Sequence, residues 1–284
     1  AVACVACFDH GTGPHARRAL ALVRRTAAVR GVEVVAERAH TAGRTEAEWR
    51  AQRWSFLRRV AAERGAHVAT AHTRDDQVET VLMRIMRGAG ARGIAALAAE
   101  GRVVRPLLGV SRAEVAAYAS ANRLAWVEDP GNSRADHLRN RVRRDLLPAI
   151  AQVRPSFADE LAALGERAAR LRAKVELFVD RELALELHGD AVLVAREMLL
   201  RYDAQALALL WPAIAARGGV TLDRRGTDRL VEFTTVERNG ARVPLSGGFE
   251  AVAHRGSIMV RRVTVGGSLQ EHRLATGVRI GRFR

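Results

Sequence analysis

The sequence predicts an α/β fold for the first part of the chain, with helices on both faces of a parallel sheet. A mostly helical segment and a small α+β domain are predicted to follow. Short apolar runs alternate with helical stretches up to residue 87, which is the βαβαβα order of a parallel sheet with right-handed crossovers. Residues 157–187 have the charge pattern of one long helix. Three short runs after residue 240 indicate a small sheet.

Capping residues set the predicted limits of the first helices. Pro14 suits the first turn of a helix, and Thr45 with Glu48 three residues later has the pattern of a capping box. Gly65 is expected to end the second helix. The predicted strands are residues 2–8, 32–36 and 67–71, and the predicted helices are residues 14–29, 45–64 and 75–87.

The remaining elements are less regular. Ser111 and Glu114 indicate a second capping box, which begins a helix that runs to about Asn122. The sequence changes character after Pro155, so we predict one domain over residues 1–154 and another over residues 155–284. Further predicted helices are residues 140–150, 157–187, 203–217 and 223–237, and further predicted strands are residues 242–245, 250–253 and 257–262.

The composition favours a polyanionic partner. The formal net charge is +15, and of the 46 basic residues Lys174 is the single lysine. Arginine is the residue that binds phosphate in a planar, bidentate way, so nucleic acid is the expected partner. An arginine-rich compositional bias is the alternative explanation. The sequence has neither a long apolar run nor a signal-peptide pattern, so we expect a cytoplasmic protein that does not enter membranes.

Cys4 and Cys7 form a C-x-x-C pair, which elsewhere indicates a zinc or redox site. Here the pair lies in a run predicted to be a buried strand. Residues three apart on a strand point to opposite faces, so the two sulfurs would diverge. We therefore assign no metal-ligating residues.

Two groups of side chains are candidates for chemistry. Asp76 and Glu79 lie on one face of a predicted helix, directly after the strand that ends near His72, and they have the charge to bind a cation. A plain capping role is the alternative. Arg84 and Arg87 lie beside a Gly-Ala-Gly segment and are suited to grip phosphate, with a solvated helix face as the alternative.

Ligands of parallel sheets bind beyond the carboxyl ends of the strands. Asp9 and His10 follow one predicted strand, and the segment from His72 to Asp76 follows another. We therefore expect these residues to contribute to one site.

Four segments carry a resemblance to a known family. AHTRDDQVETVLMRIMRGAGARGIAAL resembles the H-x-x-D-D-x-x-E-T and R-G-x-G-x-x-G segment of tRNA(Ile)-lysidine synthases. FDHGTGP and EAEWRAQRWSFL resemble two preceding motifs of that family. The block from RPLLG to LPAI resembles its R-P-L-L, E-D-P-S-N and R-N-x-x-R motifs, which separate it from the wider ATP-pyrophosphatase superfamily. Together these motifs cover residues 1 to about 150.

The resemblance implies an adenine nucleotide alpha-hydrolase-like fold and a two-step ligase reaction. ATP, with Mg²⁺, would adenylate the C2 carbonyl of the wobble cytidine in a tRNA(Ile) with a CAU anticodon, releasing pyrophosphate. The amine of L-lysine would then displace AMP to give lysidine. A homodimer is left open.

The resemblance also implies roles for individual residues. Asp76 and Glu79 would bind the lysine ammonium, and Arg53 would contact phosphate or the adenylate. Independently of the resemblance, Trp126 has the flat ring that stacks on an unpaired base, although core packing is the favoured alternative for a lone Trp after a strand. The residues implied for the nucleotide are His10, Arg50, His72, Arg84 and Arg87, with packing or capping as the alternative for the two histidines. The residues implied for tRNA are Arg105, Asn132, Arg139, Asn140, Arg141 and Arg143.

One family motif does not occur here. A strand ending in S-G-G-x-D-S, whose backbone N–H groups bind pyrophosphate, would precede Ala1. We expect the sequence to be incomplete at this end, with weak or no ATP turnover and a destabilised sheet. The S-G-G at Ser246 is followed by Phe249 and Glu250, so we predict a hairpin turn there instead.

Two other functions are alternatives to lysidine synthesis. A tRNA-thiolating enzyme of the same superfamily would need reactive cysteines near the site, which Cys4 and Cys7 do not supply. A non-catalytic tRNA-binding protein is compatible with the basic charge.

Overall fold

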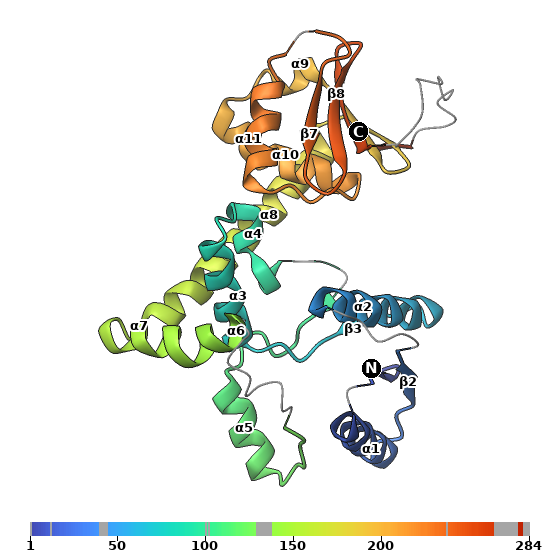
Figure 1. Cartoon of the computed structure of the whole chain (residues 1–284), viewed down its shortest axis with the longest axis vertical. Coiled ribbons are helices and arrows are strands. Elements are labelled where there is room, and N and C mark those ends of the chain that lie inside the picture. Colours follow the sequence, from blue (N-terminus) through green and yellow to red (C-terminus); the bar gives the residue numbers. More distant parts are fainter. Residues whose placement is uncertain are drawn as a thin grey trace. The chain divides into compact units, whose positions relative to one another are not determined.

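The computed structural model describes residues 2–11, 13–39, 45–99, 101, 103–128, 138–236, 238–263 and 278–280. The chain forms two compact units, one of residues 1–79 and 100–158 and the other of residues 80–99 and 159–284. Helix α3 (Arg74–Met86) begins in the first unit and continues into the second (Figure 1). None of the described helices has the length and apolar character that crossing a membrane requires.

The first unit contains two parallel strand pairs and their helices. β1 pairs with β2 from Val5↔Val34 to Asp9↔Arg38, and β3 pairs with β4. The α/β class and the parallel pairing are confirmed, but the described strands form two separate pairs rather than one continuous sheet. Besides α3, its elements are β1 (Val5–Asp9), α1 (Pro14–Val29), β2 (Val34–Arg38), α2 (Glu46–Glu63), β3 (Val68–Ala69), β4 (Val103–Val104), α5 (Arg112–Ala121), α6 (Leu138–Arg141), η3 (Val142–Leu146, a π-helix) and α7 (Leu147–Val153).

Both predicted capping boxes are present. The Glu48 N–H donates to Thr45 Oγ1 over 3.2 Å, and the Thr45 N–H donates back to Glu48 Oε2 over 3.3 Å. Ser111 and Glu114 make the same reciprocal pair at 3.1 and 2.8 Å. Gly65 takes a positive φ of 56°, a left-handed conformation that ends α2 without a Cβ clash. Local chemistry therefore sets these helix limits, as the sequence predicts.

The second unit contains a six-stranded sheet in the order β10-β5-β6-β9-β8-β7, and every described pairing in it is antiparallel. Its elements are α4 (Ala91–Ile94), η1 (Ala96–Ala98), α8 (Phe157–Glu182), β5 (Leu185–His188), β6 (Ala191–Ala195), α9 (Arg196–Leu199), α10 (Ala204–Arg217), α11 (Arg224–Phe233), β7 (Arg242–Leu245), β8 (Phe249–His254), β9 (Ser257–Arg262) and β10 (Val278–Ile280). The three strands predicted after residue 240 are confirmed as β7, β8 and β9.

Two helix predictions in this unit are too long. α8 ends at Glu182 instead of residue 187, and α11 ends at Phe233 instead of residue 237. The end of the first prediction is strand β5, which forms a hairpin with β6 around Gly189, whose φ is +58°. Leu185 faces the core and pairs with Val194, so burial in the sheet outweighs the helical charge pattern that precedes it.

The S-G-G sequence forms a hairpin turn, as predicted. Leu245 pairs with Phe249 across it, and Gly247 and Gly248 both take positive φ, at 76° and 78°. Glycine is the residue that adopts such angles without strain. This S-G-G segment is therefore a turn between β7 and β8, and no helix follows it.

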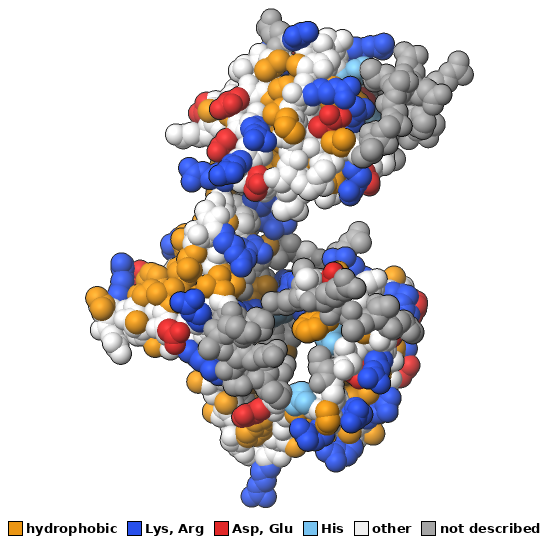
Figure 2. Space-filling model, viewed as in Figure 1, with side chains coloured by type: hydrophobic (Ala, Val, Ile, Leu, Met, Phe, Trp, Pro, Cys, Tyr) orange, Lys and Arg blue, Asp and Glu red, His pale blue; other side chains and the backbone are white. Residues whose placement is uncertain are grey.

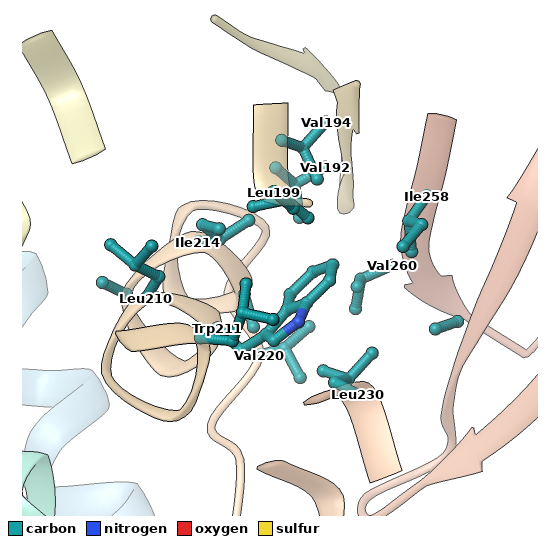
Figure 3. Packing of buried hydrophobic residues seen from close by; sticks show 14 of the residues in the cluster. Val192, Val194, Leu199, Leu210, Trp211, Ile214, Val220, Leu230, Ile258 and Val260 are labelled. Atoms are coloured by element: carbon teal, nitrogen blue, oxygen red, sulfur yellow. The ribbon is translucent and has the colours of Figure 1, made fainter. Parts of the chain in front are cut away.

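The core of the second unit surrounds Trp211, whose side chain is fully buried at 0% exposure. Its ring lies among Val220, Leu230 and Val260, which come from separate elements (Figure 3). The indole N–H donates to Thr234 Oγ1 over 2.8 Å, and this hydroxyl donates to the Leu230 carbonyl over 2.7 Å. The single polar atom of the ring is thus satisfied inside an apolar core.

Replacing Thr234 with Val tests this polar contact, because valine has nearly the same shape but no hydroxyl. The Trp211 N–H would then be buried without an acceptor, and the free energy of unfolding should fall by about 1–3 kcal/mol. Urea denaturation measures this loss. Thr235→Val is the matched control, because the exposed Thr235 hydroxyl bonds the Glu232 carbonyl, and its effect should stay within about 0.5 kcal/mol. Equal losses in the two variants would contradict the role of the buried contact.

Candidate nucleotide and amino-acid site

Polar side chains follow three strands of the first unit. His10 follows β1, His72 follows β3, and Arg105 follows β4. The His10 ring lies 5.0 Å from Phe8 and 6.0 Å from Trp49 of α2, measured between ring centroids. Helix α2 therefore lies beside the end of β1, while the expectation that the ends of β1 and β3 share one site stays a prediction.

Positive charge dominates this group. Burial lowers the pKa of His10, and the nearby Arg53 lowers it further. Burial also lowers the pKa of His72; Asp76 opposes this, while Arg105, Arg139 and Arg50 add to it. Both imidazoles are therefore neutral near pH 7, and the arginines around them provide fixed positive charge.

Three buried nitrogen atoms in this region have no hydrogen-bond partner in the described structure: His10 Nδ1, Trp49 Nε1 and Arg105 Nε. The indole and guanidinium nitrogens can only donate, so they require an acceptor. Phosphate oxygens and the ring nitrogens of a nucleobase are such acceptors. The residues present therefore fit a nucleotide, and we call His10, Trp49, Arg53 and Arg105 the nucleotide cluster.

Trp49 is a member of this cluster that the sequence analysis did not single out. The available signal was its position four residues before Arg53, which places both on one face of α2. Arg105, which was implied for tRNA, lies near Arg50 of α2, whose charge lowers the pKa of Arg105 in addition to the larger effect of burial.

Asp76 stabilises the start of α3. Its Oδ2 accepts the Thr73 N–H over 2.8 Å and the Thr73 hydroxyl over 3.0 Å, which is the capping role that the sequence left as an alternative. Its Oδ1 accepts from Arg139 over 3.0 Å and from Arg112 over 3.3 Å. Burial alone would raise the pKa of Asp76, but the Thr73 hydrogen bonds and these arginine charges lower it.

Glu79 is 1% exposed and binds three guanidinium groups. Arg143 Nε and Nη2 donate to its two oxygens over 2.6 and 3.0 Å. Arg139 Nε donates over 2.7 Å, and Arg112 Nη2 donates over 3.2 Å. Burial would raise the pKa of Glu79, but the hydrogen bonds from Arg143 and Arg139 outweigh it and lower the pKa. We call Asp76, Glu79 and these three arginines the Glu79 cluster.

The structure thus places residues implied for lysine and residues implied for tRNA in one cluster. Asp76 raises the pKa of His72 and Arg139 lowers it, so the Glu79 cluster lies near His72, which follows β3. A hollow beside α2 is lined by Arg50 but by neither Arg53 nor Asp76. The roles of Asp76, Glu79, Arg139 and Arg143 toward ligands stay predictions.

The other implied residues lie in different places. Asn140 is buried and Arg141 is exposed on α6, whereas Asn132 lies outside the described residues. Arg84 donates to the Gly93 carbonyl, and Arg87 lines a cavity of about 820 Å³; both belong to the second unit. Trp126 is 61% exposed, so the expectation of core packing for it is wrong.

Arginines also gather over α1 on the face shown in Figure 2.

Comparison with known proteins identifies the family. Residues 1–150 match the model of the PP-loop domain. The chain is 37% identical over 243 residues to a tRNA(Ile)-lysidine synthase of Bradyrhizobium sp. (strain BTAi1), covering 81% of this chain and 67% of the relative. The chain belongs to the tRNA(Ile)-lysidine synthase family.

Other relatives with this name match over shorter parts. The protein of Serratia proteamaculans is 36% identical over 72% of this chain and 48% of its own length. That of Pseudomonas aeruginosa is 46% identical over 41% of this chain and 27% of its own length. The chain thus spans half or less of these two relatives. The solved structure of the U34-tRNA thiolase NcsA from Methanococcus maripaludis is 15% identical with a TM-score of 0.49, over 58% of this chain and 60% of that one, and is too distant to bear on function.

Family membership supports lysidine synthesis, which is a ligase reaction, over the thiolating alternative. A PP-loop domain implies use of ATP, and the names of the relatives imply a tRNA substrate for those proteins.

Replacing Glu79 with Gln should strongly destabilise the first unit. The variant leaves three guanidinium groups facing one another without a buried carboxylate, and breaking a buried ion pair costs about 3–5 kcal/mol. Urea denaturation measures the change. Glu63→Gln is the control, because Glu63 forms an exposed pair with Arg59 at 3.5 Å, and its effect should be below about 1 kcal/mol. Similar stability of the two variants would contradict the importance of the Glu79 cluster.

The stability difference between the wild type and Glu79→Gln should depend on pH. The pKa of Glu79 in the folded protein is below its ordinary value of 4.5. Its contribution is therefore complete above pH 4.5 and is lost as the pH falls through the folded-state pKa. Denaturation curves recorded between pH 3 and pH 7 measure this difference, because this range includes the ordinary carboxyl pKa of about 4. A difference that grew as the pH fell would contradict the assignment.

Proposed function

We propose that this chain contributes the nucleotide-binding and lysine-binding parts of a tRNA(Ile)-lysidine synthase. The observation that carries the proposal is the nucleotide cluster: buried donors without acceptors, beside arginines and neutral histidines, at the carboxyl ends of parallel strands. Preorganised donors of this kind stabilise charge that develops in a transition state. The substrates are ATP, L-lysine and tRNA(Ile) with a CAU anticodon.

The reaction proceeds in two steps. The C2 carbonyl oxygen of the wobble cytidine bonds to the α-phosphorus of ATP, and the bond to pyrophosphate breaks. The lysine ammonium then loses a proton, the resulting amine bonds to C2, and the bond from C2 to the AMP oxygen breaks. Mg²⁺ neutralises the phosphate charge when it is bound with ATP.

Arg53, Trp49 and Arg105 are assigned to the nucleotide. The charge of Arg53 lies close enough to His10 to lower its pKa, so a phosphate in this place meets a permanent cation and a neutral imidazole. The Trp49 and Arg105 N–H groups supply donors that need no reorganisation. His10 is suited to accept or donate a hydrogen bond, because its neutral ring has one nitrogen of each kind.

The two carboxylates are given different roles. Asp76 is 18% exposed, and its Oδ1 is shared by Arg112 and Arg139 at 3.3 and 3.0 Å, so a lysine ammonium can replace one of these contacts. Glu79 is almost fully enclosed and binds Arg139 and Arg143 more closely, at 2.7 and 2.6 Å. We assign Asp76 to the ammonium and Glu79 to positioning the arginines around it.

ATP–pyrophosphate exchange, measured with the cognate tRNA in the protein that carries this chain, tests the proposal. Arg53→Ala should lower the exchange rate by about 10²-fold, because it removes a cation from the developing phosphate charge. Arg30→Ala is the control, since Arg30 lies at the exposed end of α1, and it should leave the rate unchanged.

Mass analysis of the tRNA distinguishes the possible products. Addition of lysine supports lysidine synthesis, whereas addition of sulfur would indicate thiolation. Tight tRNA binding without exchange would show a non-catalytic RNA-binding protein and overturn the proposal.

A further inference from the structure

Three side chains on successive turns of α2 form a stripe that is separate from the nucleotide cluster. Arg50, Trp54 and Arg58 are four residues apart and therefore lie on one face of the helix. The guanidinium carbons of Arg50 and Arg58 lie 6.0 and 5.9 Å from the centroid of the Trp54 ring. These three residues, with Ala51 and Ser55, line an open hollow of about 450 Å³. We call Arg50, Trp54 and Arg58 the α2 stripe.

The arginines of the stripe differ from their neighbour Arg59. Arg59 pairs with Glu37 and Glu63 and lies over Phe56, so its charge is balanced within the fold. Within the part of the chain that the structure describes, neither Arg50 nor Arg58 forms an ion pair with a carboxylate. The stripe therefore presents two uncompensated positive charges on either side of an aromatic ring.

The stripe suits a flat ligand that carries negative charge. The half-buried Trp54 ring offers an aromatic face, and the two guanidinium groups near it offer donors for phosphate. The ligand that matches a ring flanked by cations is a nucleobase with its phosphates.

The stripe lies beside the nucleotide cluster, because Arg50 and Trp54 are the chain neighbours of Trp49 and Arg53 on α2. The charge of Arg50 lowers the pKa of both His72 and Arg105, in addition to the larger effect of burial on each. A nucleotide on the stripe would therefore be close to the place where the target base reacts. An unpaired nucleotide in the same RNA loop meets this requirement, because its base is free to stack.

We propose that Arg50, Trp54 and Arg58 form a stacking platform for an unpaired nucleotide of the RNA substrate, next to the nucleotide that is modified. Trp54 stacks on the base, and Arg58 binds the adjoining phosphate. This inference rests on the proposed function and adds a contact that binds the RNA but takes no part in the bond changes.

Binding of an anticodon stem–loop that carries 2-aminopurine beside the wobble position tests the platform. Trp54→Leu keeps an apolar side chain but removes the aromatic face, and it should weaken binding by about tenfold to hundredfold. Trp54→Phe keeps an aromatic face and should retain most of the affinity. The quenching of 2-aminopurine fluorescence, which reports stacking, should be lost in Trp54→Leu alone.

Arg58→Ala provides an independent test, with Arg59→Ala as the matched control on the same helix. Arg58→Ala should weaken RNA binding and reduce the slope of log K against log salt by about 1, because one phosphate contact is lost. Arg59→Ala should change neither. ATP binding and thermal unfolding are measured in parallel, and both should be unchanged in Arg58→Ala and Trp54→Leu.

The outcomes separate this inference from the proposed function. RNA affinity and quenching that are unchanged in folded Trp54→Leu and Arg58→Ala, in a protein that still catalyses pyrophosphate exchange, overturn the platform and leave the function intact. A wild-type protein that binds neither the stem–loop nor ATP overturns both. Loss of RNA binding with ATP binding retained supports the platform.

Discussion

The buried carboxylate of Glu79 is the constraint on which the first unit depends. Removing a charged carboxylate from water is costly unless it is paired and hydrogen-bonded, and Glu79 satisfies this with three arginines. Those arginines lie 33 to 64 residues further along the chain. One carboxylate thus brings the start of α3, the first residue of α5 and the α6–η3 segment to the same point, and the position of α3 follows from it.

This arrangement divides the first unit into two electrostatic regions. In the Glu79 cluster, carboxylates compensate the arginines, and Asp76 is shared between helix capping and ion pairing. Around His10 and Trp49, buried nitrogen atoms have no hydrogen-bond partner in the described structure, and the charge of Arg53 lowers the pKa of His10. In the first region the carboxylates already hold cationic side chains, whereas the second region contains buried nitrogen atoms without hydrogen-bond partners in the described structure. A reaction that joins an amino acid to a nucleotide requires both environments close together.

The second unit is built on a different principle. Its core around Trp211 is apolar. The hydrogen bond from Trp211 to Thr234 satisfies the indole N–H and involves no charged group. Antiparallel strands cover this core with alternating buried and half-buried residues, as in β6. Such a unit gains its stability from burial of apolar area, while its many exposed arginines remain on the surface.

The sequence by itself determined the features that depend on neighbouring residues. These are the helix limits at Thr45, Gly65 and Ser111, the turn at Ser246, the α/β class and the family motifs. The tertiary structure decided which partner each charge has. It placed Arg139 and Arg143 on Glu79, brought Trp49 beside His10, and turned the end of a predicted helix into β5. Capping and turns are local interactions, whereas burial and ion pairing depend on residues far apart in the chain, whose meeting no local pattern specifies.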